Sequence, residues 1–230
     1  MSPLTSEGSQ VFTLQFEKGH LFLELDGKLW LFDTGAPTSF GDVPSINICN
    51  KPFAVSANYL GLTADAISQL AGVTCAGLLG MDVLGYFDHI VDIEGGRLTV
   101  SPNELNHDGE VIPLDEFMGI PIINVHIKGK PYRMFFDTGA QVSYFNDDSL
   151  TAFPAAGRVT DFYPGIGQFE TDIYNVPVSL GGGAFTLRYG SLPNMFSMIL
   201  AMASVNGIVG NEVIINRVIG YFPRRKMLVL

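Results

Sequence analysis

The stretch Phe32-Asp33-Thr34-Gly35-Ala36 occurs a second time as Phe136-Asp137-Thr138-Gly139-Ala140. Each copy closes a similar segment, residues 20–36 and 122–140, in which two apolar strand-like runs are joined by a short turn that ends in glycine. One Asp-Thr-Gly is weak evidence for a function, because Asp and Gly are both common in turns. Two copies in the same context indicate that the chain contains an internal repeat.

A second pair of matching blocks extends the repeat along the chain. Residues 76–84 (AGLLGMDVL) correspond to residues 206–214 (NGIVGNEVI), and each block predicts an apolar strand, a glycine and a short helix, followed by a closing strand. A helix-compatible stretch precedes each block, at residues 63–71 and 195–205. The strands are short, and the 26 Gly and 13 Pro are spread along the whole length. This pattern predicts a mainly β architecture of two similar lobes related by a pseudo-twofold axis.

The polar segment at residues 101–110 (SPNELNHDGE) separates the two copies. Its composition is typical of a linker. We therefore expect an N-terminal lobe at residues 1–100 with the first Asp-Thr-Gly, a linker at 101–110, and a C-terminal lobe at 111–230 with the second.

Composition limits the possible partners and the compartment. The net charge is −10 and the largest basic run is Arg224-Arg225-Lys226, which argues against nucleic-acid binding.

Cys49 and Cys75 both lie in the first half, and we expect two reduced thiols. Residues 1–10 lack the apolar core of a signal peptide, and Met195–Val205 is too short to span a bilayer, so we interpret it as a buried helix. We expect a cytoplasmic protein without membrane contact.

Two neighbouring carboxylates can hydrolyse an amide without a metal or a covalent intermediate, one as general base and one as general acid. At about 3 Å two full charges repel by roughly 5 kcal/mol in an effective dielectric near 20. One carboxyl therefore stays protonated well above its ordinary pKa. We predict that Asp33 and Asp137 are the catalytic pair. Gly35 and Gly139 would allow close backbone approach, and the hydroxyls of Thr34 and Thr138 can bond across to the other lobe.

The two Phe-Asp-Thr-Gly-Ala signatures, with Gly77-Leu78-Leu79-Gly80 and Gly207-Ile208-Val209-Gly210 downstream, resemble the aspartic peptidases of the pepsin and retropepsin kind. The chain looks like a retropepsin-like dimer fused into a single polypeptide. The resemblance implies a bilobed aspartic-protease fold of two β-barrel-like lobes with the active-site cleft between them. It also implies an aspartic endopeptidase that takes an extended peptide or protein substrate as an added strand. We expect a monomer that needs no cofactor.

The resemblance also assigns roles beside the two aspartates. The residues that would support the active-site loops are Thr34, Gly35 and Ala36 in the first copy and Thr138, Gly139 and Ala140 in the second. Each threonine hydroxyl would hydrogen-bond to the opposite lobe. Pepsin-like enzymes often have Ser or Thr where this chain has Ala36 and Ala140. The hydroxyl there can bond the ionised carboxylate, and its loss should raise the pKa of the pair. We therefore expect a mildly acidic activity optimum.

The family covers its cleft with a hairpin, and residues 161–172 (DFYPGIGQFETD) offer one. Tyr163, Gly165, Ile166 and Gly167 are the predicted substrate-binding flap, although an ordinary surface hairpin is the alternative. In the first half the nearest candidate, Val55–Leu62, is a poor one. We expect one flap and an asymmetric cleft.

Other kinds of site have weaker support. His20, His89, His107 and His126 show no ligand spacing, so we expect surface or strand-edge histidines and propose no metal site. Ser39 and Ser143 lack a histidine partner, which disfavours a serine hydrolase. The main alternative function is a peptide- or protein-binding module on the same fold with weak or no turnover. A structural dimerisation domain is a weaker third possibility.

Overall fold

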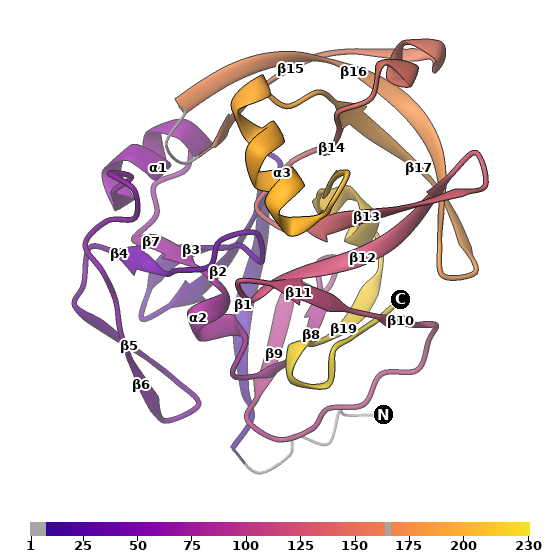
Figure 1. The fold of residues 1–230 in the computed structure, drawn as a ribbon. Helices are drawn as coiled ribbons and strands as arrows, with labels where there is room; N and C mark the ends of the chain where they lie inside the picture. The colour runs from indigo at the N-terminus through magenta and orange to yellow at the C-terminus, as the bar shows by residue number, and fades with distance from the viewer. Residues whose placement is uncertain (1–7, 164–166) are drawn as a thin grey trace.

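The computed structural model describes residues 8–163 and 167–230 (Figure 1). The protein is mainly β, as the sequence predicted. Within the described residues, no helix is both long enough and apolar enough to cross a membrane.

The first half consists mostly of short strands and has two helices. In chain order the elements are β1 (Gln10–Glu17), β2 (His20–Leu25), β3 (Lys28–Phe32), β4 (Phe40–Gly41), β5 (Ser45–Ile48), β6 (Lys51–Ala54), α1 (Ala64–Ala71), β7 (Gly77–Leu79), α2 (Met81–Leu84), β8 (Asp88–Asp92) and β9 (Arg97–Ser101).

The second half repeats this order with longer strands around its centre. Its elements are β10 (Val111–Pro113), β11 (Asp115–Phe117), β12 (Ile120–Ile127), β13 (Lys130–Phe136), β14 (Ser143–Phe145), the 3-10 helix η1 (Asp148–Ala152), β15 (Ala155–Tyr163), β16 (Gly167–Leu180), β17 (Gly183–Gly190), η2 (Asn194–Phe196), α3 (Ser197–Ala203), β18 (Gly207–Val209), η3 (Asn211–Ile214), β19 (Val218–Phe222), η4 (Pro223–Arg225) and β20 (Met227–Val229).

Matching hairpins lead into the two Asp-Thr-Gly loops. The turn between β2 and β3 has Asp26 and Gly27 at φ 52° and 74°, and the turn between β12 and β13 has Lys128 and Gly129 at φ 51° and 78°. Two central residues with positive φ suit the right-handed twist of a tight hairpin, and glycine adopts this conformation without strain. Each hairpin then ends one residue before an aspartate.

Three strands of the second half, β10, β19 and β20, join the sheet of the first half. Among the described residues, ten strands follow the order β10-β20-β19-β8-β9-β1-β2-β3-β7-β4, and eight follow β11-β12-β13-β18-β14-β17-β16-β15. β5 and β6 form a separate pair. The contact between halves in the larger sheet is the antiparallel pair β8 and β19, in which Val91 lies opposite Ile219 (Figure 1). The domain boundaries at 101–110 remain a prediction, and β10, β19 and β20 connect residues 111–230 to the first half.

Buried hydrophobic clusters pack against both Asp-Thr-Gly loops. One large buried cluster contains residues of both halves, among them Phe32 and Phe136, which precede the two aspartates. A smaller cluster in each half lies against the loop itself, around Leu31 and Ile67 in the first half and around Phe135 and Leu200 in the second. The buried residues directly before each aspartate therefore anchor the loops in packed structure.

The expectations about burial are wrong for Met195–Val205 and His89, and also for His20, which lies beside the candidate site. Met195–Val205 is helical but not buried, because only one side of α3 packs inward, through Leu200 and Ala203. His89 is buried in β8, between β9 and β19, and its ring stacks on Tyr221 with ring centroids 5.7 Å apart. A histidine there packs as an aromatic ring, and burial lowers its pKa to about 4.

Candidate active site

Asp33 and Asp137 begin equivalent loops at the ends of two parallel strand pairs. β3 pairs with β7 and β13 pairs with β18, both in parallel. The backbone N–H of Asp33 donates to the Leu79 carbonyl at 3.1 Å, and that of Asp137 donates to the Val209 carbonyl at 2.9 Å. The apolar-apolar-Gly strands found in the sequence thus hold the start of each loop.

Thr34 and Thr138 join the two loops through four hydrogen bonds. The Thr34 hydroxyl donates to the Phe136 carbonyl at 2.7 Å and accepts the Thr138 N–H at 3.1 Å. The Thr138 hydroxyl donates to the Phe32 carbonyl at 2.8 Å and accepts the Thr34 N–H at 3.0 Å. Both threonines are buried, so each hydroxyl satisfies backbone groups that water does not reach.

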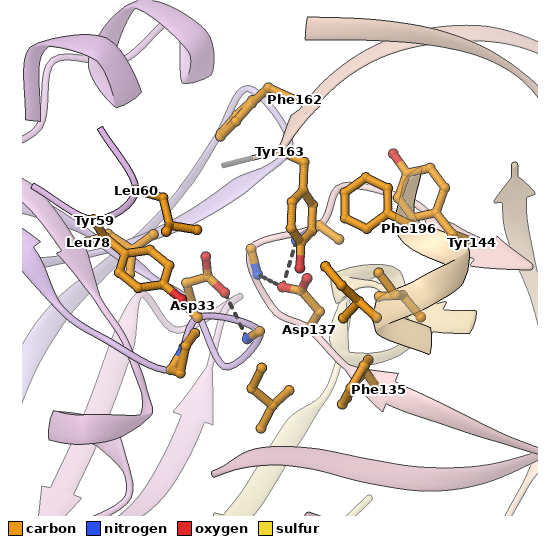
Figure 2. A pocket seen from close by; sticks show the side chains of 18 of the residues that line it. Asp33, Tyr59, Leu60, Leu78, Phe135, Asp137, Tyr144, Phe162, Tyr163 and Phe196 are labelled. Atoms are coloured by element: carbon orange, nitrogen blue, oxygen red, sulfur yellow. Dashed lines mark hydrogen bonds between the residues drawn. The ribbon is translucent and has the colours of Figure 1, made fainter. Parts of the chain in front are cut away.

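Gly35 and Gly139 bring each loop against the aspartate of the other. A Cβ on Gly35 would lie 2.2 Å from the carboxyl carbon of Asp137, and a Cβ on Gly139 would lie 2.5 Å from that of Asp33. Both distances are far below a van der Waals contact. Any other residue at either position would push the carboxyl groups apart. The carboxyl groups of Asp33 and Asp137 thus lie next to each other across the two loops (Figure 2).

Backbone N–H groups orient both carboxylates. Gly35 N–H donates to Asp33 Oδ1 at 2.8 Å, and Asp137 Oδ1 accepts the N–H groups of Gly139 at 2.9 Å and Ala140 at 3.2 Å (Figure 2). The methyl groups of Ala36 and Ala140 are buried in the clusters under the loops. The alanine side chains add no hydrogen bond to the carboxylates, whereas the backbone does.

The two aspartates have raised pKa values. Burial is the largest cause for Asp33, followed by the charge of Asp137. Burial also raises the pKa of Asp137, and the charge of Asp161 raises it further. The backbone N–H donors oppose these shifts by stabilising the ionised form. The environment therefore favours a pair that keeps a proton at mildly acidic pH.

An apolar cavity of about 380 Å³ opens above the pair. Both halves contribute large side chains to its wall, including Leu31, Tyr59, Leu60, Ile67, Leu78, Phe117, Phe135, Tyr144, Phe196 and Ile208. Among the described residues, its charged lining consists of Asp33, Asp137 and Asp161, with no Lys, Arg or His. Such a wall limits the contact of the carboxyl groups with bulk water and accepts apolar groups.

The hairpin of β15 and β16 reaches from the second half toward α1 of the first (Figure 1), and Phe162, Tyr163 and Phe169 on it line the cavity. Tyr163 lines the cavity with its hydroxyl directed toward Asp137, and its ring meets Phe196 edge-on with centroids 4.3 Å apart (Figure 2). Phe162 packs on the first-half cluster that contains Ile67. Gly167 pairs with Tyr163, whereas Gly165 and Ile166 lie outside the described residues.

The first half covers the other side of the cavity by different means. β5 and β6 form a short hairpin, and the Val55–Leu62 segment after it places Tyr59 and Leu60 in the cavity wall. Figure 2 shows Tyr59 and Leu60 on the Asp33 side of the pocket. In the part of the chain that the structure describes, the long hairpin over the cavity comes from the second half alone.

Sequence reasoning did not identify Asp161 and Tyr144 as site residues. Both are buried and line the cavity, and the Tyr144 hydroxyl donates to Asp161 Oδ2. Phe162 N–H donates to the other oxygen at 2.8 Å. Burial raises the pKa of Asp161, although the Tyr144 bond opposes the shift. The repeat held one signal, since Tyr144 and Phe40 follow their aspartates at the same offset and only Tyr144 carries a hydroxyl.

His20 was expected at the surface or a strand edge and is in fact buried beside the second loop. Its Nδ1 lies 3.0 Å from the Gly139 carbonyl and its Nε2 lies 3.1 Å from the Gln141 side-chain nitrogen. Burial lowers its pKa, and the nearby charge of Asp161 opposes that shift. Its ring also lies 5.6 Å from that of Phe162. His20 therefore connects the first half, the Asp137 loop and the turn end of the β15–β16 hairpin.

Within residues 8–163 and 167–230, no group of three or more His, Cys, Asp or Glu side chains is placed to hold a metal ion. None of the known protein-family models matches this chain. A search of curated proteins finds no significant sequence match.

The threonine bonds predict a loss of stability in a specific variant. Thr138→Val removes a buried donor and a buried acceptor and leaves the Phe32 carbonyl and the Thr34 N–H unpaired. We expect the free energy of unfolding in urea to fall by about 2–4 kcal/mol. Thr138→Ser keeps the hydroxyl and serves as the matched control. Equal stability of the valine and serine variants would contradict this account.

The raised carboxyl pKa values predict the pH dependence of stability. Below about pH 4 the pair is protonated in folded and unfolded chains alike, and its full stability is present. As the pH rises, the unfolded chain ionises freely while burial opposes ionisation in the folded protein. Wild type therefore loses stability until the pH has passed the folded pKa. We expect Asp33→Asn to exceed wild type in unfolding free energy by about 1 kcal/mol or more at neutral pH, with a smaller difference in acid.

Asp92→Asn is the control with the opposite sign for this measurement. The hydrogen bond from Arg97 lowers the pKa of Asp92, so its stabilisation is present above the ordinary carboxyl pKa and is lost as the pH falls. We expect Asp92→Asn to be less stable than wild type at neutral pH. An Asp33→Asn protein that is also less stable there would contradict the burial argument.

The position of Asp161 predicts a shift in the titration of the pair. Asp161→Asn removes the charge that raises the pKa of Asp137, so the upper titration of the pair should move to lower pH. Carboxyl carbon chemical shifts measured by NMR report this titration directly. Asp172→Asn, an exposed carboxyl on the same hairpin that pairs with Arg158, should leave it unchanged. An unchanged titration in Asp161→Asn would show that Asp161 does not act on the pair.

Proposed function

We propose that this chain is an aspartic endopeptidase of the pepsin and retropepsin kind, with a bilobed fold of two β-barrel-like lobes and the cleft between them. The observation that carries the proposal is the pair of neighbouring carboxyls, Asp33 and Asp137, which equivalent loops contribute to one apolar cavity. In aspartic proteases two such aspartates share one proton. A structural turn would need neither the second carboxyl nor its approach to the first.

The pair would act through both of its protonation states. The ionised carboxylate takes a proton from a water molecule, whose oxygen forms a bond to the carbonyl carbon of the substrate. The protonated carboxyl donates its proton to the carbonyl oxygen, which gives a neutral gem-diol. The carboxyl that gave up its proton is now ionised and takes a proton from one gem-diol hydroxyl. The second carboxyl, which holds the proton from water, protonates the nitrogen, and the C–N bond breaks. The protons belong to the pair rather than to one residue.

The hairpin supports the binding of an extended substrate. β15 and β16 cover the cavity, and Tyr163 reaches toward the carboxyl pair. An extended peptide below the hairpin would add main-chain hydrogen bonds as a further strand. Closure of the hairpin would exclude water from the reacting groups and strengthen their electrostatic interactions.

The same observations support a monomer in a reducing compartment. Both aspartates come from one chain, so a second copy is not required to complete the pair. Cys49 and Cys75 are free thiols, and free thiols are typical of cytoplasmic proteins. We propose a cytoplasmic enzyme that works without a cofactor.

A binding module is the second candidate. It is favoured by the asymmetry of the cavity, because within the described residues the long hairpin comes from the second half alone. A cleft that is covered from one side would hold a peptide with less control over its position. Such a protein would bind peptides in the cavity with little or no turnover.

Peptide hydrolysis distinguishes the two candidates. A mixed peptide library incubated between about pH 3 and pH 7 should be cleaved by wild type, with a bell-shaped profile whose alkaline side lies above the ordinary carboxyl pKa. Asp33→Asn and Asp137→Asn should each lose activity by about a thousandfold or more, whereas Asp172→Asn should retain it. Activity in either variant of the pair would exclude the shared-proton mechanism. Folded but inactive wild type would favour the binding module.

A further inference from the structure

The surface of η2 and α3 is unusually apolar. Met195, Met198, Ile199 and Met202 are 60 %, 72 %, 47 % and 68 % exposed. Their spacing of three, four and seven residues places them on one face of the helical segment. Exposed apolar residues are ordinary when they are scattered, but a contiguous group at a cleft marks an interaction site.

The matching helix of the first half shows that the fold does not require this face. α1 precedes β7 as α3 precedes β18, and both helices pack inward through one large residue, Ile67 or Leu200. The exposed side of α1 carries Asp65 and Gln69. Polar residues are therefore sufficient on the outer side of this helix, and the apolar side chains of α3 call for another explanation.

The apolar face continues into the cavity above the aspartates. Met195, Ile199 and Met202 line that cavity, and so does Met118, which is 71 % exposed in the turn between β11 and β12. We call these four residues together with Met198 the methionine ridge. Through the four residues that line the cavity, the ridge is continuous with the carboxyl pair.

The chemistry of the ridge indicates what it binds. Residues 197–203 (SMILAMA) carry no charge, so the ridge offers neither an ion pair nor the basic flank that attracts an anionic membrane surface. Methionine is flexible and polarisable, and methionine-rich surfaces accept apolar side chains of varied shape. The occupant is therefore apolar and variable in shape.

We propose that the methionine ridge is an extended subsite that binds large apolar side chains of the substrate, remote from the scissile bond and on one side of it. The substrate class is then a polypeptide with a run of apolar residues flanking the cleavage site, as in an unfolded or exposed hydrophobic segment. This inference rests on the proposed endopeptidase function. The occupant is the substrate chain itself, because the ridge is continuous with the cavity that would hold the scissile bond.

The test compares peptides that share one cleavable core. The core is extended on one flank or the other, either with leucines or with serines and asparagines. For wild type, kcat/KM should be about tenfold higher with the leucine extension on one flank, through a lower KM, because apolar area is buried there. In the double variant Met198→Ser/Met202→Ser this preference should fall close to one. Val111→Ser, at an exposed apolar residue away from the cavity, should keep the wild-type preference.

The outcomes separate this inference from the proposed function. Cleavage of the core with no gain from leucines on either flank, or a gain that survives in the double variant, would overturn the subsite and leave the endopeptidase intact. If wild type cleaves no peptide, binding of the same peptides to Asp33→Asn is measured by fluorescence anisotropy. A leucine preference that the double variant abolishes in the Asp33→Asn background would then support the subsite without the enzyme, and its absence would overturn both.

Two further measurements test the other possible occupants of the ridge. A solution mass of two chains by light scattering, reduced to one chain in the double variant, would assign the ridge to a second copy and overturn the proposal. Co-sedimentation with neutral phosphatidylcholine vesicles that the double variant abolishes would assign it to a membrane, with the same consequence. A monomer that does not co-sediment with vesicles supports the substrate as the occupant of the ridge. Circular dichroism and the urea midpoint confirm that each variant is folded.

Discussion

The hydrogen bonds between Thr34 and Thr138 are the constraint on which the candidate site depends. They are buried, and separating the loops would leave four backbone groups unpaired, each at a cost of about 1–3 kcal/mol. Because the loops are fixed, Gly35 and Gly139 hold the opposite aspartates in close contact. The raised pKa values follow from that contact and from burial. The chemistry of the site therefore derives from an interaction made by neutral side chains.

Around this symmetric centre the two halves differ, and the differences lie where a ligand would enter. Phe40 in the first half corresponds to Tyr144 in the second, whose hydroxyl donates to Asp161 near the turn of the long hairpin. The matching helices α1 and α3 expose polar and apolar residues respectively. Chemistry on a shared proton needs two equivalent carboxyls, but a peptide has a direction. Because the side chains on the two sides of the carboxyl pair differ, the site would distinguish the two ends of a bound peptide.

The buried polar groups near the pair form a continuous connection from the hairpin to the loops. Asp161 accepts hydrogen bonds from Tyr144 and from the backbone of Phe162, and His20 lies between Phe162 and the Gly139 carbonyl. Movement of the hairpin would change the surroundings of Asp161, whose charge acts on Asp137. Such a movement would therefore change the proton affinity of the pair. In an apolar cavity this effect is stronger than it would be in water.

The sequence by itself determined the repeat, the mainly β architecture, the two aspartates and the glycines beside them. These features are local, because a tight hairpin, an apolar strand and an Asp-Thr-Gly turn each depend on residues close together in the chain. Only the tertiary structure decided which side of α3 faces outward, that His20 and His89 are buried, and that Asp161 meets Tyr144 beside Asp137. Burial and side-chain contact depend on residues far apart in sequence, such as His20 and Gly139, and a one-dimensional pattern does not report which of them come together.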